Sequence, residues 1–357
     1  MEGSAIDIVI FAPIAPILGV LLFWFIQLLF VESQKYLISK ISKKHEPLCR
    51  FTNFLGILFQ SICHALGFTV TRHGISEFYV SVHYGKVKPK KQKKGIFEWT
   101  ANAFLFIGPF FIPALLILLC LLVFTPDAFK VVTPSELLHL KYTFAEQFIT
   151  FGTSIFNFAG SFFGFLVNID LLNPGHFGFF VLLIFLGMGI RPSYIGEKVR
   201  KKVNMTYDLQ NIWGHIRNQP LYVILLFLLS YIIFYISLVF NQNWYVFLFS
   251  VFGWLSIISI VALLIADLIV ILIKTTDELP KLWNVIPYLN MFISYIIARG
   301  IFFTVYPFAE EFTNIVSLFV MIFSTILITL ALLKFKTNKF KTKITMKKLI
   351  KKEGKKR

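Results

Sequence analysis

Charged residues are scarce in this chain of 357 residues, because Asp, Glu, Lys and Arg together make up 15% of it. A soluble globular domain carries about 25% charged and about 45–50% apolar residues. Here the apolar share is 57%, and the mean hydropathy is +0.75. The composition excludes an ordinary soluble protein and predicts an integral membrane protein.

Cysteines and catalytic motifs are also scarce. The three cysteines are an odd number scattered along the chain, so they build no disulfide framework. The sequence contains no glycine-rich phosphate loop, no G-x-S-x-G motif and no paired-carboxylate pattern. The chemistry of common soluble enzymes is therefore not indicated.

Acidic residues number 18 against 35 basic ones, and the net charge of +17 is concentrated in two blocks. Residues 86–94 contain six lysines and no acid, whereas residues 334–357 contain eleven lysines, Arg357 and one acid. Basic blocks beside apolar spans mark the cytoplasmic side of a membrane and attract anionic lipids. We expect anionic-lipid contacts at this loop and at the tail, and no nucleic-acid binding.

Apolar runs of about 20 residues, the length that crosses a bilayer core of about 30 Å, recur along the chain. Seven such runs cover residues 8–31, 99–124, 174–194, 219–241, 244–274, 283–305 and 311–335. The shorter segment 51–70 is an eighth candidate. The predicted fold is an all-α integral membrane protein with seven or eight transmembrane helices and a short β segment on the cytoplasmic side.

The charges of the loops predict the orientation of the spans. The basic loops 32–50, 71–98 and 191–218 and the tail are expected in the cytoplasm, which places the protein in the cell membrane with a cytoplasmic C-terminus. Both flanks of 51–70 are then cytoplasmic. This segment therefore either re-enters the membrane from one side or breaks the charge rule. A re-entrant helix must be surrounded by protein or by a wet cavity.

The segment 144–165 combines an apolar stripe, with spacings that alternate between four and three residues, and a second stripe of uncharged polar residues. This pattern favours a helix lying in the outer membrane interface. A helix packed on the transmembrane bundle is the alternative.

The stretch FQSICHALGF, residues 59–68, places polar side chains at membrane depth. Gln60 and His64 stand four residues apart and share a helix face. This is the spacing of the two histidines in the zinc-binding motif H-E-x-x-H, whose glutamate is the general base. Here Gln60 replaces the first histidine and Ser61 replaces the glutamate, so no catalytic residue is predicted.

Three further segments follow this degenerate motif. His64-Ala65-Leu66 precedes Phe78–Val87, which alternates like an edge strand, and then Ile107-Gly108-Pro109 and Leu186–Ser193. In this order they resemble the site-2 protease family of intramembrane zinc metalloproteases over residues 50–205. The resemblance implies a helical membrane core built around a metal-binding helix.

The resemblance also implies a third zinc ligand, an aspartate near an Asn-Pro turn of a later span. Asn173-Pro174 is present here without that aspartate, while His176 and Asp170 lie close by in sequence. The chain is therefore predicted to be a pseudoenzyme without a cofactor. A rewired zinc site formed by Cys63, His64, Asp170 and His176 is the alternative.

Two charged residues fall inside predicted spans. Asp267 is expected about 10 Å from the cytoplasmic end of its helix and Arg299 near the outer end of the next one, so the two should not pair. Arg299 is expected to snorkel outward. Asp267 is a candidate ion or proton site, with a carboxyl group hydrogen-bonded inside the bundle as the alternative.

The sequence thus predicts a first transmembrane helix with a basic loop, a metalloprotease-like core, a four-helix C-terminal region and a polybasic tail, at residues 1–50, 51–205, 206–335 and 336–357. The predicted function is non-catalytic binding of a membrane protein or peptide in the groove around residues 51–110. A transporter or channel, indicated by the Pro/Gly breaks, and a zinc peptidase with substituted ligands are the alternatives.

Overall fold

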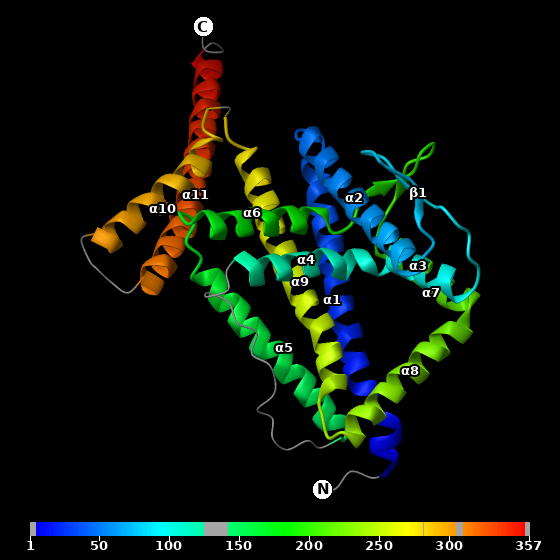
Figure 1. The fold of residues 1–357 in the computed structure, drawn as a ribbon. Coiled ribbons are helices and arrows are strands. Elements are labelled where there is room, and N and C mark those ends of the chain that lie inside the picture. The colour runs from blue at the N-terminus through cyan, green and yellow to red at the C-terminus, as the bar shows by residue number, and fades with distance from the viewer. Residues whose placement is uncertain (1–4, 125–141, 281, 305–309, 354–357) are drawn as a thin grey trace. The chain divides into compact units, whose positions relative to one another are not determined.

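The chain forms two compact units, seen in a computed structural model that describes residues 5–124, 142–280, 282–304 and 310–353 (Figure 1). Unit 1 comprises Met1–Phe165 and Leu171–Leu268, and unit 2 comprises Leu166–Asp170 and Ile269–Arg357. This division follows packing alone. The functional segments expected from the sequence stay a prediction.

The all-α membrane fold is confirmed. Within the described ranges, seven helices are long and apolar enough to cross a membrane, and a bent pair adds an eighth if it counts as one span. The seven are α1 (Ile14–Ile41), α2 (Glu46–Val70), α5 (Phe144–Val167), α8 (Pro220–Val239), α9 (Trp244–Thr276), α10 (Ile286–Thr304) and α11 (Glu310–Glu353). A short π-helix, η1 (Asp7–Phe11), precedes α1.

The predicted span 99–124 is a bent pair, α3 (Ile96–Phe106) and α4 (Gly108–Phe124), with an angle of 69° between the two helices. The bend falls at Gly108-Pro109, where proline has no N–H to continue the helix ladder and suits the first turn of a new helix. The predicted span 174–194 is also corrected. It contains α6 (Pro174–Gly189), whose 16 residues are about 24 Å long and fall short of a bilayer core.

In unit 1, α4 and α6 lie side by side and run across α1 and α9 (Figure 1). Gln27 of α1 donates a hydrogen bond to the Phe110 carbonyl in α4, at 2.9 Å. Seven residues further along α1, Gln34 donates to the Gly187 carbonyl in α6. Two buried glutamines of one helix therefore fix the positions of both crossing helices.

The segment predicted to lie in the outer interface forms α5, and its aromatic stripe is buried within unit 1. Phe158 stacks on Trp254 of α9 with ring centroids 5.2 Å apart. Phe151 lies directly against Gly19 of α1 and also contacts Gly253 of α9. These contacts favour a helix packed on the transmembrane bundle, the alternative to the expected helix in the outer interface.

The predicted edge strand 78–87 is wrong in its bounds, because a turn interrupts it. The structure has an antiparallel hairpin of β1 (Ile75–Val80) and β2 (Gly85–Pro89). The Ser81 hydroxyl accepts from the Tyr84 N–H and donates to the Tyr84 carbonyl, which closes the turn. A second, shorter hairpin pairs β3 (Tyr194–Ile195) with β4 (Lys201–Lys202), and α7 (Met205–Asn218) follows it.

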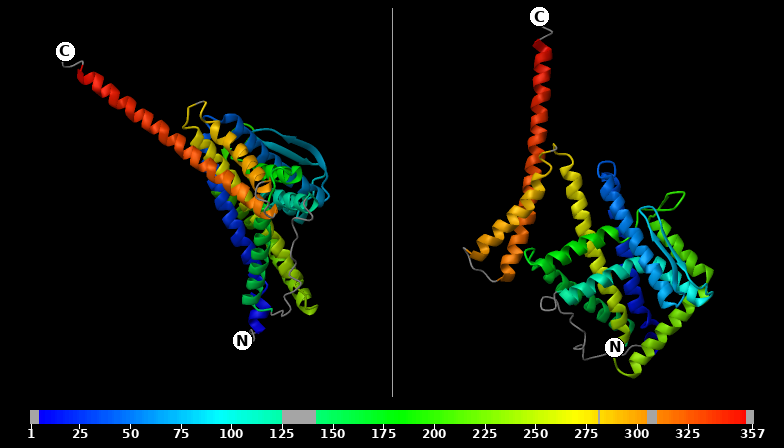
Figure 2. Two further views of the ribbon diagram at one scale, coloured as in Figure 1. Left: turned by 90° about the vertical axis from the view of Figure 1, so that its left-hand side faces the viewer. Right: turned by 45° about the horizontal axis from the view of Figure 1, so that its top comes forward.

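The first hairpin lies along α2, as both views of Figure 2 show. It leaves the C-terminal end of α2 at the hydrogen bond from His73 N–H to the Phe68 carbonyl, 2.8 Å. Gly85 packs on Ser61 in the middle of α2, and the Val82 carbonyl accepts from Asn53 near its N-terminal end. The lysine-bearing strand β2 thus runs beside α2, which favours the re-entrant alternative for this helix.

Labelling of single cysteines tests this topology. In a variant whose three native cysteines are replaced by alanine, we expect Lys44→Cys and Lys91→Cys, on the two flanks of α2, to react from the same side of sealed, oriented vesicles. The reagent is a membrane-impermeant maleimide. Gln242→Cys, in the turn between α8 and α9, is the control and should react from the opposite side. Reaction of the two flanks from opposite sides would show that α2 crosses the membrane.

Candidate functional site

A polar stripe runs along one face of α2. Asn53, Gln60 and His64 lie within about 40° of one another around the helix, because successive residues are about 100° apart. Ile57 and Ser61, on one side of the stripe, face the β1–β2 hairpin. On the other side, Gly56 lies against Arg191 and Pro192, and Cys63 lies against Gly108. The stripe therefore lies between the hairpin and the segment that follows α6.

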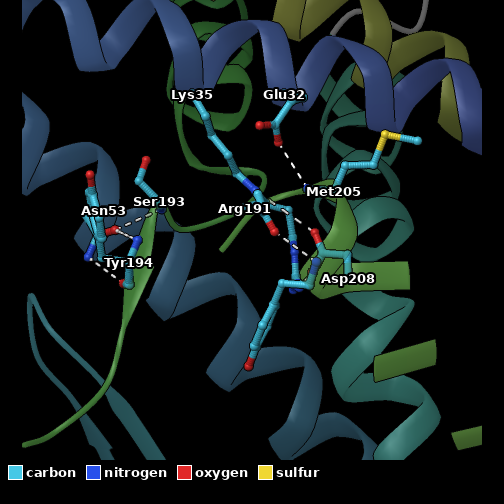
Figure 3. A network of polar contacts seen from close by, with 10 residues as sticks. Glu32, Lys35, Asn53, Arg191, Ser193, Tyr194, Met205 and Asp208 are labelled. Carbon is cyan, nitrogen blue, oxygen red and sulfur yellow. Dashed lines mark hydrogen bonds and ion pairs between the residues drawn. The ribbon is translucent and has the colours of Figure 1, made fainter. Parts of the chain in front are cut away.

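Asn53 uses its whole amide to join two distant segments (Figure 3). Its Nδ2 donates to the carbonyls of Val82, at 2.6 Å, and Tyr194, at 3.0 Å. Its Oδ1 accepts from the N–H groups of Ser193 and Tyr194, both at 2.9 Å. The residue is buried, with 3% of its surface exposed. Sequence reasoning missed Asn53, although an amide in an apolar helix, seven residues before Gln60 and on the same face, was a signal for this role.

Gln60 and His64 carry unused hydrogen-bonding atoms. Gln60 Oε1 and His64 Nε2 are buried, and neither has a hydrogen-bond partner among the described residues. The His64 ring packs on Phe68, with ring centroids 4.3 Å apart. Ser61, at the position of the catalytic glutamate in H-E-x-x-H, points instead at Gly85 of β2. The stripe can hydrogen-bond a ligand, but it presents no carboxylate to activate water.

The other candidate metal ligands lie elsewhere. His176 lies in the first turn of α6, where the Asn173 side chain caps the helix by accepting from the N–H groups of Gly175 and His176. The opposite end of α6, at Gly189, packs on α2. Asp170 belongs to unit 2. Over the described ranges, no group of three or more His, Cys, Asp or Glu side chains is placed to hold a metal ion. The predicted absence of a cofactor and the alternative of a rewired zinc site both stay predictions.

A buried ion cluster joins α1, the end of α6 and α7 (Figure 3). Arg191 pairs with Asp208, and Lys35 Nζ lies 4.0 Å from the second Asp208 oxygen. The exposed fractions of the three side chains are 2%, 2% and 5%. Glu32 accepts a hydrogen bond from the Met205 N–H at the start of α7. Two carboxylates thus lie at the positive N-terminal end of α7, where they are stabilising.

The charges of this cluster balance, since Lys35 and Arg191 face Asp208 and Glu32. The balance is needed because an unpaired ion buried in protein costs several kcal/mol. The Arg191 guanidinium also lies 5.4 Å from the centre of the Phe110 ring, a cation–π contact with α4. The cluster therefore fixes α7 and the segment after α6 against α1, α2 and α4. Sequence reasoning did not find it, because its members are far apart in the chain.

Asp267 is buried in α9, and its Oδ1 has no hydrogen-bond partner among the described residues. The candidate ion or proton site and the alternative of a hydrogen-bonded carboxyl inside the bundle both stay predictions. Arg299 is buried in unit 2, with its Nη2 3.2 Å from Asp170 Oδ2, while the Tyr295 hydroxyl donates to Asp170 Oδ1 at 3.1 Å. The expected outward snorkelling of Arg299 is therefore wrong, because Asp170 supplies a partner within the protein.

Comparison of the chain with protein-family models, with curated proteins and with solved structures gives no match. The resemblance to site-2 proteases rests on the residues of the chain alone and stays a prediction. The function proposed for this chain therefore rests on the geometry of the site.

Removal of the Asp208 carboxylate from the ion cluster should strongly destabilise unit 1. Asp208→Asn leaves Lys35 and Arg191 as buried cations with one remaining carboxylate, so we expect a loss of about 3–5 kcal/mol in the free energy of unfolding. Glu46→Gln is the matched control, because its ion pair with Arg50 is exposed and is worth about 0.5 kcal/mol. Thermal unfolding in detergent, followed by tryptophan fluorescence, measures both. Equal effects of the two changes would contradict a structural role for the cluster.

His215 of α7 should make the stability of the protein depend on pH. Its ring stacks on Trp99 of α3 at 4.8 Å, and burial lowers its pKa below the ordinary value of 6.5. The neutral ring is favoured in the folded state, so its stabilising contribution is present above about pH 6.5 and is lost as the pH falls from there. We expect the melting temperature to fall less between about pH 7.5 and about pH 5.5 in His215→Phe than in the parent chain. His83→Phe, at an exposed position, should keep the parent slope, and an unchanged slope in His215→Phe would contradict the assignment.

Proposed function

We propose that this multi-pass membrane protein binds an extended segment of another membrane protein along the free edge of β1, beside the polar stripe of α2, and does not cleave it. The observation that carries this proposal is the unprotected edge of β1. Strand edges expose unpaired N–H and C=O groups, and an extended peptide can bind there as an additional strand.

The two strands of the hairpin differ in edge protection. β2, with the sequence GKVKP, carries two lysines and a proline, residues that discourage pairing with another strand. β1, with the sequence ISEFYV, carries Glu77 as its single charge. Lys88 and Lys86 pair with Glu77 at 2.8 and 3.1 Å and hold its pKa below the ordinary value. β1 is thus the strand suited to receive a partner, and its Phe78 and Tyr79 side chains are each 47% exposed.

The register of the hairpin identifies the free main-chain groups. Ser81 N–H donates to the Tyr84 carbonyl at 2.9 Å, so this pair is hydrogen-bonded. Hydrogen-bonded and non-hydrogen-bonded pairs alternate along an antiparallel ladder. In the recorded register, Val80 faces Gly85 and Phe78 faces Val87, so both are non-hydrogen-bonded pairs. The N–H and C=O groups of Phe78 and Val80 therefore point to the free edge.

The polar stripe of α2 supports the binding of a peptide rather than its hydrolysis. Gln60 Oε1 can accept a peptide N–H, and His64 Nε2 can donate to a peptide carbonyl or accept from an N–H, depending on its tautomer. Hydrolysis would need a general base beside the metal position. That position holds Ser61, whose side chain faces β2.

A cross-link placed on β1 tests the proposal in membranes of cells that express the protein. With p-benzoylphenylalanine in place of Tyr79, we expect an adduct with an intact membrane protein. Phe78→Pro removes the outward N–H and should abolish the adduct, whereas Phe78→Ala keeps the N–H and should retain it. Formation of the same adduct in Phe78→Pro would count against strand pairing at the edge of β1. Cleavage of the captured protein that is lost in His64→Ala, together with zinc bound to the parent chain, would favour the peptidase alternative.

Transport remains the second candidate function, and the bent pair α3–α4 is the observation that favours it. Broken helices at membrane depth commonly surround transported substrates. Ion or solute flux into proteoliposomes that is abolished by Asp267→Asn would support transport. Asp267 is the charged residue chosen for this test because it is buried in α9 and its Oδ1 has no hydrogen-bond partner among the described residues.

A further inference from the structure

One corner of unit 1 collects basic residues from three separate parts of the sequence. Lys93 Nζ donates to the Thr71 carbonyl at 3.1 Å, which brings the lysine-rich end of the β1–β2 hairpin next to Arg72. Trp99, at the start of α3, stacks on His215 near the end of α7. These contacts bring together three chain segments that carry cations, which are Arg72, Lys90, Lys91, Lys93, Lys94 and, two residues after His215, Arg217. We call this set the basic corner, and Glu98 is the exposed acid nearest to it in sequence.

Large apolar side chains are exposed in the same corner. Ile96 and Phe97 of α3 are 45% and 50% exposed, Trp213 of α7 is 65% exposed, and Leu221 of α8 is 62% exposed. Lys93 Nζ lies 5.0 Å from the centre of the Phe97 ring. Exposed tryptophan and phenylalanine beside lysine and arginine are typical of the zone where lipid headgroups meet the apolar core.

Helix α8 fixes where the membrane surface lies. Six consecutive residues, Ile224–Leu229, are all exposed, and six residues at about 100° each cover every side of a helix. This part of α8 is apolar and exposed on every side among the described residues, so we expect lipid to surround it. The helix begins at Pro220, and its Tyr222 ring lies 5.8 Å from Trp99. The bilayer surface therefore passes through the basic corner.

We propose that the basic corner binds the phosphate groups of anionic phospholipids. Its cations lie where the headgroup phosphates are, and its exposed apolar side chains lie where the acyl chains begin. An acidic peptide would be attracted by the charges alone and would leave the apolar residues unused. This proposal is independent of partner binding at β1. It adds Arg72, Arg217 and the ends of α3, α7 and α8 to the lysine-rich loop expected from the sequence.

Native mass spectrometry of the full chain with added phosphatidylglycerol or phosphatidylcholine tests the site. We expect phosphatidylglycerol to be retained, and its apparent affinity to fall by at least about tenfold when Lys90, Lys91, Lys94 and Arg217 are changed to glutamine, because each cation near an anionic surface contributes about fivefold. Lys93 is kept, since it holds Thr71. Changing the three lysines to arginine keeps the charge and should keep the lipid.

The matched control removes the same charge from the β3–β4 hairpin, in Lys198→Gln, Arg200→Gln, Lys201→Gln and Lys202→Gln, and should leave retention unchanged. An equal loss in both variants would reduce the site to general charge attraction and overturn the proposal. Equal retention of phosphatidylcholine, displacement of the lipid by millimolar inorganic phosphate, or binding of a hexaglutamate peptide in place of the lipid would also overturn it.

Discussion

The buried amide of Asn53 is the interaction on which the arrangement around α2 depends. An asparagine side chain has two N–H donors and one oxygen with two lone pairs, and here all four capacities are used on main-chain groups. Burial of an amide without partners costs about 1–3 kcal/mol, so complete pairing makes an otherwise unfavourable residue stabilising. The turn of the first hairpin and the start of β3 are held to α2 through this single side chain.

The hydrogen bonds of Asn53 also determine where the lysines of β2 lie. The chain leaves the C-terminal end of α2 and is brought back toward its N-terminal end, so the lysines of β2 lie beside the helix. Lysines exposed at the hydrocarbon centre are costly, and this face of α2 must therefore be in contact with water or protein. Length and apolar composition alone therefore do not decide whether α2 crosses the membrane, and the basic residues on both of its flanks favour the re-entrant alternative.

Much of the fold could be predicted from the sequence because its causes are local. The apolar runs, the break at Gly108-Pro109 and the cap at Asn173 are each encoded within a few residues. The pairs Arg191–Asp208 and Arg299–Asp170 could not be predicted, since which distant charges meet depends on how helices pack. For α5, a stripe with spacings of four and three has the same form whether lipid or protein covers it. The strand prediction extended through Ser81–Tyr84 because that turn contains no glycine or proline.

The contact between Gly85 and Ser61 gives position 61 of α2 a role in packing. Gly85 of β2 lies so close to Ser61 that even a Cβ atom on Gly85 would collide with the Ser61 hydroxyl. A side chain longer than serine at position 61 would force the hairpin away from α2. The position that holds the general base in H-E-x-x-H is therefore used here to pack the hairpin against the helix. The same close contact holds the hairpin on the side of α2 that carries Ser61, next to the polar stripe of Gln60 and His64.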